Sequence, residues 1–121
     1  MLHIDPLSRT PIYEQITAAL EHFILAGALK AGEQVPSVRR ISLEQNINPR
    51  TVLKAYADLD TRGIITALPG KGYFVATDAV QRLTEGKRAK LSAFLALAEE
   101  LAAAGIDKSE LDALLARAYK K

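Results

Sequence analysis

Residues 48–62 read N-P-R-T-V-L-K-A-Y-A-D-L-D-T-R, and this stretch contains the start of a helix and one apolar face. Asn48 can cap the first turn through its side-chain oxygen, and Pro49 suits the first helical position, where an N–H would have no partner. The apolar residues Val52, Ala55, Tyr56 and Leu59 follow at helical spacing. The sequence therefore predicts a helix over residues 48–62 that packs one face against a core.

The opposite face of this predicted helix is polar. Arg50, Thr51, Lys54 and Asp58 lie on it, and the two cations are one turn apart. A short helix whose exposed first turns offer cations, a hydroxyl and free N–H groups suits the phosphate-lined major groove of DNA. We therefore interpret residues 48–62 as a recognition helix that enters the major groove.

A second short helix is expected directly before the recognition helix. Ser37 is a suitable N-cap, Val38 and Ile41 supply an apolar side, and a turn is expected at Gln45 and Asn46. Two short helices joined by a turn of three or four residues form a helix-turn-helix unit.

The chain before residue 37 is expected to hold this unit in place. Residues 3–4 can form a short strand, and Thr10 can cap a helix that starts at Pro11. The helical spacing of the apolar residues in this segment ends at Gly27.

After residue 63 the spacing of apolar residues changes to that of strands. Residues 64–68 and 73–75 read as the two strands of a β-hairpin, with a Gly-rich tip over residues 69–72. A plain tight turn is the alternative interpretation of the tip taken alone. Its place directly after the recognition helix favours a wing, whose tip lies at the minor groove with Lys71 entering or bordering it.

Residues 78–121 are predicted to be helical and are rich in alanine and leucine. Gly86 costs about 1 kcal/mol relative to alanine inside a helix, which leaves open whether the helix breaks there. Asp107 and Glu110 have the spacing of a capping box for a final helix. Such a hairpin is too small to build its own core, so either the first domain or a second copy must cover it. Dimerisation is favoured because two-fold symmetry suits DNA half-sites.

The sequence as a whole predicts a mainly α protein with a small β-hairpin. We expect a winged helix-turn-helix DNA-binding domain over residues 1–77 and a C-terminal helical hairpin for dimerisation over residues 78–121. The chain is 49% hydrophobic and 25% charged, as ordinary soluble proteins are. Its formal charge of +2 indicates no partner, but residues 37–74 hold six cationic residues against three acidic ones. This excess surrounds the predicted recognition helix, although a solvated surface would also account for it.

Catalysis, metal binding and membrane insertion find little support. The chain has no cysteine, which excludes disulfides, a thiol nucleophile and a Cys-ligated metal. His3 and His22 are isolated, no serine has a G-x-S-x-G context, and the G-K-G of residues 70–72 lacks the rest of a P-loop. Neither a signal peptide nor an apolar run long enough for a membrane span is evident. We therefore expect a cytoplasmic protein that is not an enzyme and has no cofactor, metal or membrane partner.

Several short motifs occur in a fixed order. They are I-D-P and P-I-Y-E-Q-I within residues 4–16, G-x-L-x-x-G at 27–32, P-S-V-R at 36–39, N-P-R-T-V at 48–52, A-Y at 55–56 and G-K-G-Y-F-V at 70–75. In combination they resemble the GntR family of bacterial transcription regulators. The short helical tail resembles the YtrA branch, whose members lack the large effector domain of their relatives. The motifs cover residues 4–76, and the tail matches only in size and type.

The resemblance implies a homodimeric repressor that binds an inverted-repeat operator in double-stranded DNA. It assigns DNA contacts to the start of the second helix, the recognition helix and the wing. With Arg40 added, the candidate DNA-binding residues are Arg39, Arg40, Asn48, Arg50, Thr51, Lys54, Gly70, Lys71 and Gly72. Leu53 departs from the family pattern, because relatives often carry a polar or basic residue there. It either meets a thymine methyl group or borders the core.

The roles of the arginines are not equally well defined. Arg50 either contacts guanine through two hydrogen bonds, worth about 1–3 kcal/mol of discrimination, or clamps a phosphate. Arg39 is expected to contact a phosphate, because its helix supports the recognition helix. Arg40 can instead pair with Glu44 one turn later. Asn48 is expected to act primarily as a cap.

A function of another class is the alternative: a winged helix that binds a second protein, with the basic surface incidental. The sequence leaves open the operator, the sign of regulation and the existence of a small-molecule effector. Because the tail is short, an enclosed effector pocket of about 300 Å³ or more is expected only at a subunit interface.

Overall fold

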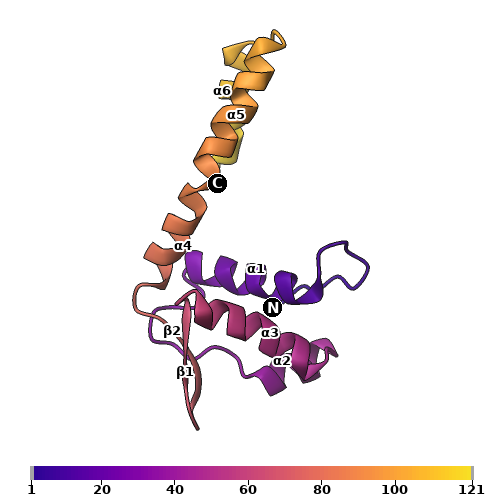
Figure 1. Ribbon diagram of the computed structural model, residues 1–121, viewed down its shortest axis with the longest axis vertical. Coiled ribbons are helices and arrows are strands. Elements are labelled where there is room, and N and C mark those ends of the chain that lie inside the picture. Colours follow the sequence, from indigo (N-terminus) through magenta and orange to yellow (C-terminus); the bar gives the residue numbers. More distant parts are fainter. Residues whose placement is uncertain (1, 121) are drawn as a thin grey trace. The chain divides into compact units, whose positions relative to one another are not determined.

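The computed structural model describes residues 2–120 and is mostly helical with one two-stranded antiparallel hairpin, as predicted (Figure 1). Its elements are α1 (Ile12–Leu25), α2 (Val38–Gln45), α3 (Pro49–Thr61), β1 (Ile65–Leu68), β2 (Gly72–Val75), α4 (Ala79–Arg88), α5 (Lys90–Ala103) and α6 (Lys108–Ala118). The chain forms two compact units, which meet between Thr84 and Glu85 inside α4. We call residues 2–84 the winged unit and residues 85–120 the tail unit.

The winged unit contains the predicted helix-turn-helix, and its local signals act as expected. The Ser37 hydroxyl accepts a hydrogen bond from the amide of Arg40 at 3.0 Å, which caps α2. The turn after α2 is made by Asn46, which adopts the left-handed conformation with φ 53°. Asn48 then caps α3, accepting from the amide of Arg50 at 2.8 Å.

The core of the winged unit lies between α1, α3 and the base of the hairpin, and α2 closes one side. The predicted stripe of α3 is fully buried: Val52, Ala55, Tyr56 and Leu59 each have 0% of their surface exposed. Other buried side chains come from every remaining element of the unit, among them Ile16, Leu20, Ile24, Ile41, Ile65, Val75, Ala79 and Leu83. One face of the predicted recognition helix, α3, is thus packed against a continuous apolar core.

The hairpin pairs β1 with β2 in the register Ile65↔Val75 to Leu68↔Gly72. Its tip is a tight turn in which the Lys71 amide donates to the Leu68 carbonyl at 2.9 Å. Gly70 occupies the position of this turn that needs a positive φ, here 77°.

Two expectations for the first residues are wrong. Residues 3–4 form no strand, and α1 starts at Ile12 without a side-chain cap. The reason is the Gln15 side chain, which reaches back over the first loop. Its amide donates to the carbonyls of Asp5 and Thr10 at 2.9 Å each, and its oxygen accepts from the Asp5 amide at 2.7 Å. These bonds order residues 5–10 as a loop and leave Thr10 outside the helix.

In the tail unit the helix passes through Gly86, and α4 and α5 are separated only at Ala89. After α5, Gly105 has φ 88° and the Ile106 amide donates to the Leu101 carbonyl at 3.1 Å, which forms a glycine C-terminal cap. The predicted capping box of α6 is wrong, because Asp107 makes no side-chain cap hydrogen bond. No helix in the described part of the chain is long and apolar enough to cross a membrane.

Candidate nucleic-acid interface

The candidate interface is built from three places in the winged unit: the start of α2, the first turns of α3 and the tip of the hairpin. At the start of α2, Arg39 is exposed, and it makes no ion pair within residues 2–120. Its neighbour Arg40 pairs with Glu44 at 2.8 Å, which was the alternative weighed for it. That hydrogen bond raises the pKa of Arg40 above its usual value. Arg39 is therefore the freer of the two cations.

The first turns of α3 present their polar side chains as the sequence indicated. Arg50 is exposed and unpaired among the described residues, and Thr51 is half-buried beside it. Leu53 has 45% of its surface exposed, so it lies at the surface and not inside the core. Asn48 is occupied by its cap bond, and this agrees with its predicted primary role.

Lys54 is placed differently from Arg50. Its ammonium group lies 4.1 Å from the centre of the Tyr13 ring on α1, a cation–π contact between the two helices. The Tyr13 hydroxyl in turn lies 3.3 Å from a Glu14 carboxylate oxygen, and the charge of Glu14 raises the Tyr13 pKa. Lys54 is therefore held at the seam between α1 and α3.

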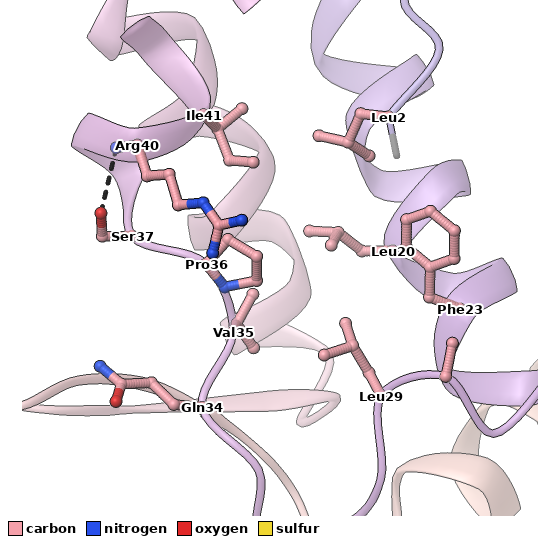
Figure 2. Close-up of a pocket in the computed structure, with 11 residues that line it drawn as sticks. Leu2, Leu20, Phe23, Leu29, Gln34, Val35, Pro36, Ser37, Arg40 and Ile41 are labelled. Carbon is pink, nitrogen blue, oxygen red and sulfur yellow. Dashed lines mark hydrogen bonds between the residues drawn. The ribbon is translucent and has the colours of Figure 1, made fainter. Parts of the chain in front are cut away.

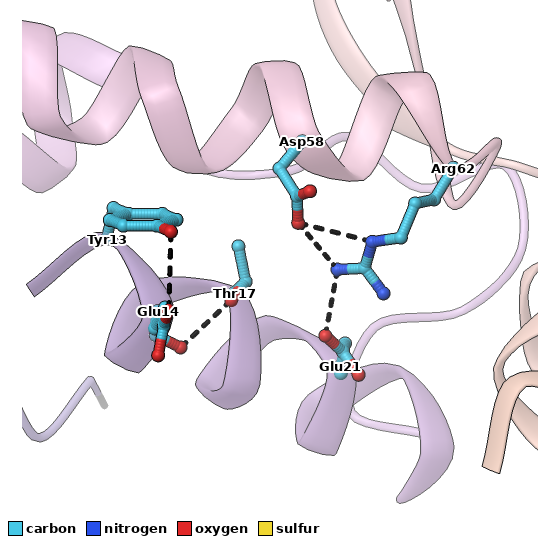
Figure 3. Close-up of polar contacts among 6 residues, drawn as sticks. All are labelled: Tyr13, Glu14, Thr17, Glu21, Asp58 and Arg62. Carbon is cyan, nitrogen blue, oxygen red and sulfur yellow. Dashed lines mark hydrogen bonds and ion pairs between the residues drawn. The ribbon is translucent and has the colours of Figure 1, made fainter. Parts of the chain in front are cut away.

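Figure 3 shows that this seam continues along both helices. Arg62 of α3 contacts Glu21 of α1 at 3.0 Å and Asp58 of its own helix at 2.9 Å. Burial lowers the Arg62 pKa, but the hydrogen bonds to Glu21 and Asp58 outweigh it and leave the pKa raised. These contacts join the surfaces of α1 and α3 beside the apolar core that packs the two helices together.

The hairpin tip carries Gly70, Lys71 and Gly72, all exposed. A Cβ on Gly70 would meet no atom within 4 Å, so this glycine is required by the turn alone. A Cβ on Gly72 would lie 2.8 Å from the side-chain nitrogen of Gln34, and φ at Gly72 is 117°. Lys71 makes no ion pair with any described residue, which leaves its ammonium group free for an anion.

Tyr56 connects the supporting elements behind these surfaces. Its hydroxyl donates to the carbonyl of Pro36 just before α2, and its ring meets that of Tyr73 on β2 edge-on at 5.1 Å. Burial raises the Tyr56 pKa, so the hydroxyl stays a donor. One buried ring on α3 thus contacts both the start of α2 and the base of the hairpin.

A cavity of about 570 Å³, partly open to solvent, lies beside the start of α2 (Figure 2). Its walls are mostly apolar, with Leu20, Leu29 and Ile41 among them, and Arg40 stands at its edge. The sequence predicted that an enclosed effector pocket would form only between subunits. This cavity is partly open and lies within one chain, so that statement stays a prediction. Among the described residues no group of three or more His, Asp or Glu side chains gathers to hold a metal ion.

Sequence reasoning missed the residues that position the interface: Tyr13, Glu21, Gln34 and the Arg62 network. The spacing of Asp58 and Arg62 was visible as an i, i+4 pair. The contacts from Arg62 to Glu21 and from Gln34 to the hairpin span 41 and 37 residues of chain, and no local pattern announces them.

Comparison with known proteins places the chain among bacterial regulators. Residues 12–75 match the family model "Bacterial regulatory proteins, gntR family". The HTH-type transcriptional repressor YtrA of Bacillus subtilis is 45% identical over 87 residues, which is 72% of this chain and 67% of that protein.

Two solved structures extend the comparison. A transcriptional regulator from Oenococcus oeni has a TM-score of 0.75 at 25% identity and covers 99% of this chain and 100% of its own. The DNA-binding domain of AraR, solved in complex with operator ORX1, has a TM-score of 0.56 at 27% identity over 62% of this chain and 93% of its own.

Proposed function

Because the chain belongs to the GntR family of bacterial regulatory proteins, we propose that it represses transcription as a homodimer bound to an inverted-repeat operator. Family membership makes the chain a sequence-specific DNA-binding transcription regulator and not an enzyme. The proposal adds the sign of regulation, the symmetry of the operator and the residues that contact it. The similarity of the chain to the repressor YtrA supports repression as the sign of regulation.

The recognition helix, residues 48–62, carries the major-groove contact in this proposal. The supporting observation is that Arg50 stands exposed on the first turn of a capped helix whose other face is fully buried. Arg50 reads a guanine or clamps a phosphate, Thr51 contacts the backbone or a base beside it, and Leu53 is exposed enough to meet a thymine methyl group. Lys54 contributes a phosphate contact from the seam, where Tyr13 holds it.

The other contacts come from the two neighbouring elements. Arg39 binds a phosphate from the start of α2, and Arg40 is a weaker candidate because Glu44 already neutralises it. The wing, residues 69–72, reaches the minor groove with Lys71 at its tip, and its glycines allow the backbone to approach the duplex. Asn48 acts through the cap that shapes the first turn of the reader.

The tail pairs two chains, so that the winged unit of the second chain contacts the other half of the operator. No side chain in residues 85–120 is buried, although α5 and α6 are rich in leucine. Leu91, Phe94, Leu95 and Leu97 each leave between 56% and 61% of their surface exposed. An exposed apolar surface of this kind marks an interaction site, and a second copy of the chain would cover it symmetrically. We therefore assign DNA binding to the winged unit and dimerisation to the tail unit. Residues 78–84, expected to be part of the dimerisation segment, hold Ala79 and Leu83 of the winged core, so the boundary of this proposal lies at residue 84 and not at 77.

One binding experiment tests whether the recognition helix contacts the operator. Operators are selected from a random duplex pool, and binding of the full chain is measured by mobility shift over a salt series. Arg50→Ala is expected to weaken operator binding by about five- to 150-fold, since one bidentate contact is worth about 1–3 kcal/mol. Arg88→Ala is the matched control, because Arg88 is an exposed arginine paired only with Glu85 among the described residues. Equal and negligible losses would reject the assignment and favour a protein-binding role.

A second experiment tests the dimer. Sedimentation of the full chain at micromolar concentration is expected to give a dimer, and a chain ending at residue 84, which keeps the whole winged unit, is expected to give a monomer. A full-length monomer would reject the dimer, and a dimeric truncation would place its interface in the winged unit.

A further inference from the structure

Gln34 lies in the connector between α1 and α2 and contacts the tip of the hairpin. Its side-chain amide donates to the carbonyl oxygen of Lys71 at 2.9 Å, across 37 residues of chain. Within residues 2–120 this is the one side-chain hydrogen bond that reaches residues 69–72. Gln34 itself is exposed, so the core does not require it.

The connector brings Gln34 there because residues 32–35 form backbone hydrogen bonds with β2. The Gly32 amide donates to the Val75 carbonyl at 2.8 Å, and the Val75 amide donates to the Glu33 carbonyl at 2.9 Å. The Val35 amide then donates to the Tyr73 carbonyl at 2.8 Å, and Gln34 forms an isolated antiparallel bridge with Phe74. This pairing places the Gln34 backbone opposite Phe74, in the half of β2 nearer the core, and from there its side chain reaches the Lys71 carbonyl near the tip.

Gly72 has a second requirement that follows from this arrangement. A Cβ at position 72 would stand 2.8 Å from the Gln34 side-chain nitrogen, closer than such contacts occur. The positive φ of 117° disfavours a side chain at the same place. Gly72 therefore leaves the space through which Gln34 reaches the Lys71 carbonyl.

The base and the tip of the hairpin are held by different means. The base is anchored in the core through Ile65 and Val75, which are buried, and through the Tyr73 ring against Tyr56. From Thr66 to Lys71 every residue is exposed, so no apolar packing fixes the tip. Apart from the pairing of β1 with β2, the Gln34 bond is what connects the tip to the rest of the winged unit.

We propose that Gln34 is a positioning residue for the wing: its amide, seated over Gly72, holds the Lys71 backbone so that the Lys71 ammonium group is presented to the operator. This inference rests on the wing contact of the proposed function. It assigns Gln34 no contact with DNA, and its whole effect passes through Lys71.

The first test needs no DNA. Gln34→Met keeps the length of the side chain but removes the amide donor. In ¹⁵N spectra of the full chain, this change is expected to shift the amide signals of Gly70, Lys71 and Gly72 and to increase their fast motion. Gln45→Met is the matched control, because the Gln45 amide also donates to a backbone carbonyl, that of Leu2, at 3.1 Å. Wing signals that are the same in wild type and Gln34→Met would overturn the proposal.

The second test is a double-mutant cycle on operator affinity. Lys71→Ala is expected to lower affinity and to reduce the slope of log affinity against log salt by about one. Gln34→Met is expected to lower affinity by about two- to tenfold, the range of one ordinary hydrogen bond, and to add nothing in the Lys71→Ala background. Equal losses from Gln34→Met in both backgrounds would overturn positioning through Lys71.

The two tests separate this inference from the function on which it rests. If Lys71→Ala leaves operator affinity unchanged, the wing contact and the DNA half of this inference are both wrong. The amide spectra would still decide whether Gln34 holds the tip. If Lys71→Ala weakens binding and Gln34→Met does not, the wing contact stands and the positioning role of Gln34 is wrong.

Discussion

The two units of the chain use their apolar residues in opposite ways. In the winged unit they are gathered inside, and Val52, Tyr56 and Leu59 have no exposed surface at all. In the tail unit, the side chains of α5 and α6 are at best half-buried, and Leu91 remains 61% exposed. Burial of apolar surface contributes about 25 cal/mol per Å², so the first unit stabilises itself while the second leaves most of that free energy unused. The winged unit therefore has a core of its own, whereas the apolar residues of the tail unit are available to the proposed dimer.

Removing a core side chain from the winged unit should have the largest effect. Leu59→Ala is expected to lower the free energy of unfolding by about 2–5 kcal/mol, because it removes fully buried atoms and leaves a cavity. Leu43→Ala is the control, since Leu43 is 71% exposed in the same unit. Urea unfolding followed by circular dichroism measures both. Losses of similar size would show that the winged unit does not depend on its own core.

A charge on the open face of α5 should have the next largest effect, and on assembly instead of folding. Phe94, Leu97 and Leu101 of α5 line a groove shared with α6, whereas Leu91 and Leu95 lie outside it, one turn apart. Leu95→Asp is expected to shift the dimer toward monomer by at least tenfold in dissociation constant, since a carboxylate would have to lose its water at the interface.

Ala96→Asp is the matched control for this experiment. Ala96 is exposed on α5 and is not among the residues that line the groove. Ala96→Asp introduces the same charge as Leu95→Asp, one position further along α5 and on the side of the helix turned away from the leucines. Sedimentation equilibrium measures both variants. A dimer that tolerates Leu95→Asp as well as Ala96→Asp would mean that this face is not the interface.

Two residues at helix starts allow a finer comparison of the units. Asn48 bonds the first turn of α3, while Asp107, at the same position of α6, makes no cap hydrogen bond. Asn48→Ala should therefore cost about 1 kcal/mol of stability, and Asp107→Ala only a few tenths. Thermal unfolding of the two variants measures the difference. A larger loss for Asp107→Ala would contradict the assignment of the functional cap to α3.

What the sequence could reveal follows the same division between local and distant contacts. The caps of α2 and α3 and the turn at Asn46 depend on residues within one turn of chain, and they were predicted, although the left-handed conformation of Asn46 was not. Thr10 does not cap α1. Its carbonyl accepts a hydrogen bond from the side-chain amide of Gln15, a contact that depends on how the whole loop folds. The partner of Lys54 was also invisible, because Tyr13 approaches it from another helix.

The DNA-facing residues show the limit more sharply. A helical period identified which face of residues 48–62 is outside, and so it identified Arg50. It left Arg39 and Arg40 both as candidates, and the i, i+4 spacing of Arg40 and Glu44 supplied the alternative that the structure shows for Arg40. It could not separate the two wing glycines, because only the approach of Gln34 gives Gly72 a role that Gly70 lacks.

The smallest expected effect concerns ion pairs in the two units. Arg62 bridges α1 and α3, and its partner Glu21 has only 18% of its side chain exposed. The pair of Lys108 with Asp112 lies within α6, and 88% of the Lys108 side chain is exposed. Water screens the second pair almost fully, so Asp112→Asn should leave stability unchanged within error.

Glu21→Gln should cost up to about 1 kcal/mol, because Arg62 keeps Asp58 but loses its contact with the neighbouring helix. A double-mutant cycle with Arg62→Met, measured at low and high salt, isolates the coupling between the helices. The coupling should persist at high salt, since partly buried pairs are screened less than exposed ones. If salt abolishes it, the α1–α3 seam is held by the apolar core alone, and the ionic contacts of the winged unit add no more than those of the tail.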